Sequence, residues 1–235
     1  MNQPSQDITL AEELKQSNVS RRKFLRYSGA FGASVIVAGS IGGLSGCKKD
    51  DNANEGINLG SGDTGVLNYA YALEQLEAAF YTQVIASQFS GISAAETAYL
   101  TDIRDHEIAH REFFKTALGS NAIQALQVDF SSINFGSRDS VLATAKAFED
   151  LGVSAYNGAG KLLTDPGNLL VAGKIVSVEA RHAALIRELL TPNSFAASDV
   201  VDSNGLDKAR TPGEVLSIAG AYLKSKLNAS NLPTS

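Results

Sequence analysis

Two short motifs of a glutamate and a histidine could carry chemistry in this 235-residue chain. Glu107 and His110 form one Glu-x-x-His motif, and Glu179 and His182 form a second one. This spacing places both side chains of a motif on one face of a helix, one turn apart, so that both can reach one centre. Carboxylate oxygens and imidazole nitrogens are common ligands of transition metals. One such motif is weak evidence, but two of them in one chain indicate a metal site.

Two more glutamates complete the expected ligand set. Glu74 and Glu149 interrupt apolar helical stripes at the same point at which the two motifs carry their glutamates. Burying an unpaired carboxylate is costly, and four carboxylates that face one another also repel. Either several of them stay protonated, or cations lie between them. Two divalent ions would neutralise four carboxylates, and two neutral imidazoles would add nitrogen ligands. The sequence therefore predicts a dinuclear carboxylate site.

Four long helical patterns and a shorter one must position these residues. The expected helices are residues 64–89, 93–119, 137–163, 169–191 and 212–223. Short links make the first two helices antiparallel neighbours, and likewise the next two. About 17 residues, 120–136, separate the pairs, and extended they reach ~55 Å, more than the ~38 Å of a 25-residue helix. The predicted fold class is therefore all-α, a four-helix bundle of two hairpins joined by a long crossover, with a short C-terminal helix.

The motifs in this order resemble those of the ferritin-like superfamily. The resemblance covers roughly residues 64–190, and "ALEQLEAAFY" in the first helix looks most like bacterial ferritin-like domain proteins related to plant desiccation-related proteins. It implies bridging roles for Glu107 and Glu179 and terminal roles for the other two glutamates. It further implies that His110 and His182 each hold one of two metal ions, with Fe favoured over Mn. The same ligands are compatible with Zn.

The two halves of the expected bundle echo each other. Tyr81 follows Glu74 by seven residues, and this spacing is similar to that of bacterioferritin and rubrerythrin. Tyr156 follows Glu149 by the same interval. The spacing favours Glu74 over Glu77 as the ligand on the first helix, and Glu77 stays open as an extra ligand or as a partner of one. An inward tyrosine is usually a core residue with a satisfied hydroxyl, so a role beside the ligands is the less favoured interpretation for both tyrosines.

The complete ligand set favours a competent site over a relic that binds no metal. The chain has three histidines, and the third, His106, adjoins Glu107. We expect His106 to be exposed or to contact a ligand residue.

The first 47 residues carry the features of an export signal. "SRRKFL", residues 20–25, resembles the twin-arginine signal, and "LSGC", residues 44–47, resembles a lipobox. A transmembrane helix is one alternative, but six glycines between residues 28 and 46 make a poor span. A signal that is cut elsewhere, with Cys47 incidental, is another. The order and spacing favour a lipoprotein signal in which Cys47 is lipidated, so that the membrane is a partner through this anchor.

Composition and charge limit the remaining possibilities. A single cysteine excludes an internal disulfide framework, and a net charge of −5 argues against a nucleic-acid partner. Residues 48–63 are polar and rich in glycine and asparagine, which is typical of a flexible tether. The bundle is expected over residues 64–191 and a C-terminal extension over 192–235, whose last helix caps the bundle or contacts a partner, the cap being favoured. A homodimer is one assembly that the sequence leaves open.

Three functions suit these expectations. The first is redox chemistry at the dinuclear site, such as Fe(II) oxidation or a reaction with O2 or peroxide. The second is a non-catalytic metal-binding or desiccation-protective role in the cell envelope, and the third is a metal-free scaffold. The ligand residues indicate what kind of site is present, but they do not identify its substrate. A lipid anchor and a tether on each subunit fit a closed storage shell poorly.

Overall fold

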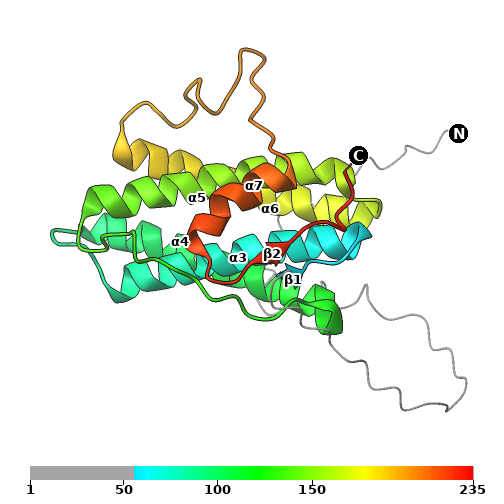
Figure 1. Cartoon of the computed structure of the whole chain (residues 1–235). Helices are drawn as coiled ribbons and strands as arrows, with labels where there is room; N and C mark the ends of the chain where they lie inside the picture. The colour runs from blue at the N-terminus through cyan, green and yellow to red at the C-terminus, as the bar shows by residue number, and fades with distance from the viewer. Residues whose placement is uncertain (1–55, 235) are drawn as a thin grey trace, which may run out of the picture. The chain divides into compact units, whose positions relative to one another are not determined.

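The computed structural model describes residues 56–234, which form a bundle of four long helices (Figure 1). The helices are α3 (Gly62–Ala86), α4 (Ala94–Leu118), α5 (Arg138–Ala159) and α6 (Pro166–Leu190). α3 packs along α4 and α5 along α6 as two hairpins, and the hairpins meet mainly through α3 and α5. The prediction of an all-α four-helix bundle with a short C-terminal helix is confirmed.

Shorter elements extend these helices or pair the chain ends. Three 3-10 turns follow α4, α5 and α7: η1 (Gly119–Asn121), η2 (Gly160–Leu162) and η3 (Gly220–Tyr222). The C-terminal helix is α7 (Pro212–Ala219), and the two short strands are β1 (Ile57–Asn58) and β2 (Leu227–Asn228).

Capping residues begin two helices where the sequence predicts them. The Glu96 N–H donates to Ser93 Oγ (3.1 Å), and the Ser93 N–H donates to Glu96 Oε2 (2.9 Å), which is a capping box before α4. Thr211 and Glu214 form a second capping box at the start of α7. These hydrogen bonds satisfy backbone donors that the first turn of a helix leaves free, so they fix where each helix begins.

Asp63 does not cap α3, although the sequence indicates a helix start beside it. The cap position is Ser61, whose side chain makes no capping hydrogen bond. The Asp63 carboxylate instead accepts four hydrogen bonds from the turn between α5 and α6. The donors are Thr164 N–H and Oγ1–H (both 2.8 Å), Asp165 N–H (3.0 Å) and Asn168 Nδ2–H (2.9 Å). The carboxylate thereby ties the second hairpin to the first turn of α3.

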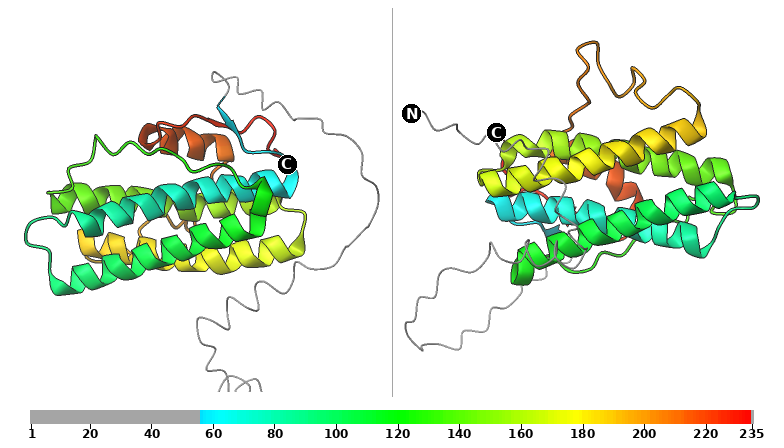
Figure 2. Two further views of the ribbon diagram at one scale, coloured as in Figure 1. Left: turned by 90° about the horizontal axis from the view of Figure 1, so that it is seen from below. Right: turned by 180° about the vertical axis from the view of Figure 1, so that it is seen from behind.

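The connection between the hairpins, residues 122–137, contains no helix and runs along the bundle from α4 to α5 (Figure 2). Its aromatic side chains cover the outer face of α3. Phe80 contacts Phe130 and Phe135 there, with ring centroids 6.0 and 5.9 Å apart. The long crossover predicted from the sequence is therefore confirmed, and it also supplies part of the core.

The C-terminal extension covers the bundle beside this crossover. Val215 and Ala219 of α7 are fully buried in the core. Tyr222 packs edge-to-face on Phe148 of α5, with ring centroids 4.7 Å apart. Its carbonyl accepts a hydrogen bond from the Asp129 N–H of the crossover (2.8 Å). The prediction that the last helix caps the bundle is confirmed.

Residues 57–59 belong to the folded domain, although the sequence places them in a flexible tether. β1 pairs in parallel with β2, and Leu59 is 0% exposed. The tether prediction is therefore wrong for these residues, because backbone pairing and a buried leucine hold them. The rest of the predicted tether up to residue 55, the twin-arginine motif and Cys47 lie outside the described residues. Between residues 56 and 234, no helix has both the length and the apolar character that a membrane span requires.

Candidate metal centre

Each long helix of the bundle carries a fully buried glutamate near the middle of its length. They are Glu74 on α3, Glu107 on α4, Glu149 on α5 and Glu179 on α6, and all four are 0% exposed. Apolar residues at helical spacing, such as Leu100 and Ile103 on α4, bring these positions into the core. Glutamate is rarely fully buried unless it is paired. Four of them at one level therefore need a common partner.

His110 and His182 join these carboxylates in two overlapping clusters. The first cluster consists of Glu74, Glu107, His110 and Glu179, and the second of Glu107, Glu149, Glu179 and His182. Within each cluster, one ligand atom from every residue lies within 4.8 Å of the others. Glu107 and Glu179 belong to both clusters. The structure brings all six predicted ligands together. Two carboxylates belong to both clusters and two belong to one cluster each, as expected for two bridging and two terminal carboxylates.

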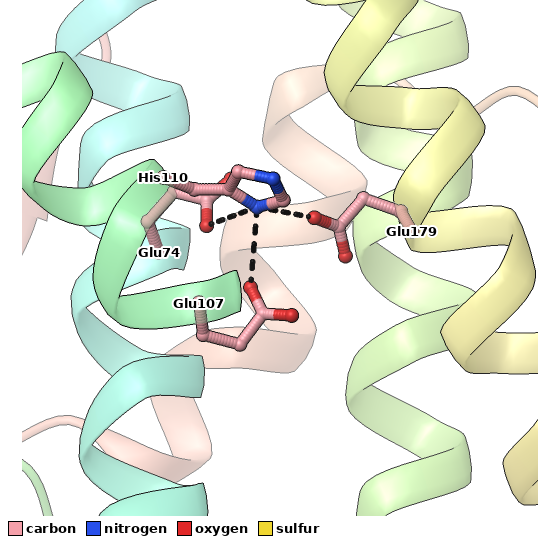
Figure 3. Close-up of side chains that lie close together, drawn as sticks. All are labelled: Glu74, Glu107, His110 and Glu179. Carbon is pink, nitrogen blue, oxygen red and sulfur yellow. Dashed lines mark ion pairs between the residues drawn. The ribbon is translucent and has the colours of Figure 1, made fainter. Parts of the chain in front are cut away.

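The first cluster surrounds Nδ1 of His110 (Figure 3). This nitrogen lies 2.9 Å from Glu179 Oε1, 3.4 Å from Glu74 Oε2 and 3.6 Å from Glu107 Oε2. The three carboxylates come from α6, α3 and α4, so they approach the imidazole from different sides. Such convergence of oxygens and one nitrogen from three helices fits a single ion better than a chain of pairwise hydrogen bonds.

The second cluster surrounds Nδ1 of His182. This nitrogen lies 2.8 Å from Glu107 Oε1, 3.5 Å from Glu149 Oε2 and 3.9 Å from Glu179 Oε2. In both clusters Nδ1 is the ring atom that faces the carboxylates. Nδ1 is therefore the atom of each histidine that could bind a metal ion.

Most of the unpaired buried polar atoms of the described chain lie in these clusters. Ten buried side-chain nitrogen and oxygen atoms lack a hydrogen-bond partner, and eight of the ten belong to the six predicted ligands. The short distances at the two Nδ1 atoms thus occur without hydrogen-bond geometry. Leaving so many polar atoms unpaired in a dry interior would cost far more than typical proteins tolerate. Two divalent cations between the carboxylates would pair them, so the residues present fit a dinuclear centre.

The two inward tyrosines bind the carboxylates of the opposite hairpin. Tyr81 on α3 donates its hydroxyl hydrogen to Glu149 Oε1 on α5 (2.5 Å), and Tyr156 on α5 donates to Glu74 Oε1 on α3. Both tyrosines are buried, as expected for core residues with satisfied hydroxyls. Their acceptors are two of the cluster carboxylates. Each tyrosine therefore fixes one oxygen of a glutamate and leaves the other oxygen, Oε2, to its cluster.

The fold and this centre agree with a known family. A family model described as a ferritin-like domain matches residues 62–192, from the start of α3 to just beyond α6. This match covers more than half of the chain. The chain belongs to the ferritin-like domain family. A comparison with curated proteins found no match.

His106 supports one half of the ferritin-like centre. Its Nδ1 lies 2.9 Å from Nε2 of His182, and the two rings are nearly parallel, with an angle of 8° between them. When Nδ1 of His182 faces a metal ion, its Nε2 carries the hydrogen and donates it to His106. In the second hairpin, Val178 precedes Glu179, whereas in the first hairpin His106 precedes Glu107. The second hairpin therefore has no histidine at the position that corresponds to His106. Sequence reasoning allowed a contact with a ligand residue but did not identify His182 as the partner.

Glu77 lies beside the two clusters and belongs to neither of them. It is 3% exposed and faces Gly152 of α5, where an added Cβ would lie 3.0 Å from Glu77 Oε1 and 3.7 Å from Glu179 Oε2. Glu77 follows Glu74 by three residues, just as Gly152 follows Glu149. The extra carboxylate on α3 therefore occupies space that the absent side chain on α5 leaves free. The repeated spacing in the sequence pairs Glu77 with Gly152. That Gly152 leaves room for the Glu77 carboxylate was not predicted from the sequence.

Burial and mutual repulsion raise the pKa of most of the buried carboxyl groups at the centre of this ferritin-like domain. Burial raises the pKa of Glu74 to about 7. Burial, together with the charges of the neighbouring carboxylates, raises the pKa of Glu77 and that of Glu179 well above the usual range. Burial also raises the pKa of Glu149. Without cations, several of these groups would therefore hold protons at neutral pH.

Glu107 is the exception, because it lies between the two imidazoles. Burial acts to raise its pKa, but the adjacent His110 and His182 outweigh burial and lower the pKa of Glu107 to about 2. Burial acts to lower the pKa of His182, while Glu107 and Glu149 raise it to about 10. The carboxylates beside His110 raise the pKa of that imidazole as well. Metal ions that bind here must displace these protons, so binding and proton release are coupled.

Proposed function

We propose that this ferritin-like protein binds two divalent metal ions, Fe or Mn, at the six-residue centre and uses them in redox chemistry with O2 or peroxide. The observation that carries the proposal is the set of eight unpaired buried atoms, all of which belong to the six residues. Glu107 and Glu179 each offer both oxygens, one to each cluster. Oxygen-rich ligands with two imidazoles suit Fe and Mn.

The chain's own residues would prepare the centre for this chemistry. Two such ions, when bound, supply a redox pair that can pass electrons to O2 or peroxide. Glu107 and Glu179 would hold the ions, while Tyr81 and Tyr156 keep Glu149 and Glu74 in position through their hydroxyls. The closely packed helices exclude bulk water, since the four glutamates are 0% exposed. A dry, preorganised site strengthens every electrostatic interaction within it.

Turnover assays with matched variants test the redox proposal. We expect the purified chain to oxidise Fe(II) with O2, or to consume peroxide, and the Glu107→Ala/Glu179→Ala variant to lose this activity. Glu112→Ala is the control, because Glu112 lies on α4 with its side chain 49% exposed and pairs only with its neighbour Arg111 among the described residues. A metal-loaded chain without either activity would contradict redox chemistry but not metal binding.

A non-catalytic role is the second candidate. The side chain of His110 is 13% exposed, and the other five ligand side chains are at most 5% exposed. Such enclosure favours retention of ions over frequent exchange. In that case the protein would sequester metal, or protect the envelope under desiccation, and metal-loaded protein would fail both turnover assays.

We also propose that the chain acts in the cell envelope, because residues 20–25 resemble a twin-arginine signal and residues 44–47 resemble a lipobox. The twin-arginine route exports folded proteins, which suits a metal centre that is filled before export. We expect the protein in its host to partition into detergent and Cys47→Ser to lose this behaviour. A Ser45→Ala control keeps the cysteine. Equal partitioning of the Cys47→Ser variant would contradict the lipid anchor.

A further inference from the structure

Glu77 lies on α3 between the residues that reach the two clusters. Glu74 belongs to the first cluster, and Tyr81, seven residues later, donates to Glu149 of the second cluster. Glu77 stands between them on the same face of α3, one turn after Glu74. It faces Gly152 of α5, which follows Glu149 by three residues. The Glu77 carboxylate is therefore beside the candidate centre, although it is a member of neither cluster.

The carboxylate of Glu77 is close to a glutamate that both clusters share. A Cβ added to Gly152 would lie 3.0 Å from Glu77 Oε1 and 3.7 Å from Glu179 Oε2, so one point on α5 is near both carboxylates. Glu179 belongs to both clusters. A charge on Glu77 would therefore act on any ion that Glu179 binds.

Glu77 differs from the four cluster glutamates in the charges around it. Each of those four has an oxygen at most 3.5 Å from an imidazole Nδ1. Glu77 is 3% exposed, and burial, followed by the charges of the cluster carboxylates with Glu179 first, raises its pKa well above the usual range. Cations at the two clusters would reverse this balance, because a nearby opposite charge favours the ionised form of a carboxyl group.

Charge balance gives this fifth carboxylate a consequence for the ions. Two divalent ions balance the four cluster glutamates when both imidazoles are neutral. A charged Glu77 then leaves one negative charge in excess, inside a protein interior in which charges interact more strongly than in water. One trivalent ion in place of a divalent ion removes this excess.

We propose that Glu77 makes the centre favour trivalent over divalent ions, and hence the oxidised over the reduced state of Fe or Mn. Glu77 acts through its charge, which is added to that of the six predicted ligands. This inference rests on the metal binding of the proposed function, but it does not depend on turnover.

Zn(II) and Ga(III) are suitable probes, because both have a filled d shell and neither changes its oxidation state. Their dissociation constants from the full chain would be measured at one pH, in competition with a chelator of known affinity for each ion. We expect Glu77→Gln, which removes the charge at nearly constant shape, to lower the preference for Ga(III) over Zn(II) about 10- to 100-fold. This is the range for one unit charge about 7 Å away at an effective dielectric constant of about 20.

Two further variants separate the charge of Glu77 from its packing. Glu77→Asp keeps the charge and should retain most of the preference for Ga(III). Glu112→Gln is the matched control, because it removes the same charge from a position on α4 where the side chain is 49% exposed. It should leave the ratio of the two dissociation constants unchanged.

The ratio of the two affinities decides between the outcomes. An unchanged ratio in Glu77→Gln would overturn the proposal, because Glu77 would then be uncharged in the loaded protein. Equal weakening of both ions would also overturn it, since Glu77 would then act only through packing. A ratio that falls as far in Glu112→Gln would do the same, because the effect would follow from net charge. A wild type that binds neither ion would contradict the proposed function together with this inference, whereas binding of both ions with an unchanged ratio in Glu77→Gln would contradict this inference alone.

Discussion

The hydroxyl of Tyr81 lies 2.5 Å from Glu149 Oε1, so a side chain of the first hairpin positions a candidate ligand of the second. Tyr156 and Glu74 form the reciprocal pair. The repeated Glu-to-Tyr spacing in the sequence thus corresponds to reciprocal hydrogen bonds between the two hairpins. Because each hydroxyl occupies one oxygen, each terminal glutamate has one oxygen left for an ion. The tyrosines therefore hold one oxygen of each of these glutamates as well as filling the core.

Removing either tyrosine hydroxyl should weaken metal binding. We expect Tyr81→Phe and Tyr156→Phe each to raise the dissociation constant for Mn(II) about 10- to 100-fold, the range for outer partners of metal ligands. The metal-free variants should also lose about 1–3 kcal/mol of stability, because a buried carboxylate oxygen loses its donor. Competition with a chelator measures the first effect and urea unfolding the second.

Tyr99→Phe is the control for this pair, because Tyr99 is 42% exposed on α4. It should change neither quantity. If Tyr81→Phe and Tyr156→Phe bound Mn(II) as tightly as the wild type, the two hydroxyls would be core contacts without a role in ligand positioning.

His106 should affect one ion more than the other. His106→Ala removes the partner of His182 Nε2, so we expect the ion held by His182 to bind about 10- to 100-fold more weakly. The ion held by His110 should change little, because no equivalent histidine supports it. A calorimetric titration with Mn(II) should therefore separate into two steps.

His106→Asn provides a graded comparison, since its side-chain oxygen can still accept a hydrogen bond. It should fall between the wild type and His106→Ala. Equal weakening of both steps would show that His106 acts through general stability, and unchanged binding would show that the contact with His182 has no role in metal affinity.

Asp63 should make stability depend on acid pH. Burial acts to raise its pKa, but hydrogen bonds from Thr164, Asn168 and Asp165 outweigh burial and hold the pKa of this carboxyl well below its usual range. A depressed pKa stabilises the folded state above the ordinary value of about 3.9, and this contribution is lost as the pH falls below it. We expect Asp63→Asn to cost about 1–2 kcal/mol at pH 7, with allowance for partial exposure.

The difference between wild type and Asp63→Asn should shrink as the pH falls from about 5 to 3. Urea unfolding of the metal-free proteins over this range provides the measurement. Asp105→Asn is a suitable control, because the side chain of Asp105 is 59% exposed and, within residues 56–234, pairs only with Arg104. A difference that is constant with pH would mean that the charge of Asp63 contributes nothing.

Much of the centre was predictable because its ligands recur at fixed helical intervals. Glu107, His110, Glu179 and His182 are spaced so that one helical turn brings each pair together, and apolar neighbours force that face inward. The capping box at Ser93 was predictable for a similar reason, since its hydrogen bonds join residues three apart.

Features that depend on how separate helices cross were harder to predict. The contact of His106 with His182 joins residues 76 positions apart, and the carboxylate of Asp63 reaches a turn about a hundred residues away. The order at residues 57–59 depends on pairing with the distant β2. No local pattern encodes these distances, because they arise only when the hairpins pack.

Metal content of the chain, purified without added metal, tests the dinuclear centre most directly. We predict two Fe or Mn ions per chain in the wild type and in Glu112→Ala, and almost none in Glu107→Ala/Glu179→Ala. Chelation should lower the melting temperature of the wild type, because ions that bind only the folded state stabilise it. A wild type that contains no metal, takes up none when Fe(II) or Mn(II) is supplied, and is as stable after chelation as before would contradict the centre.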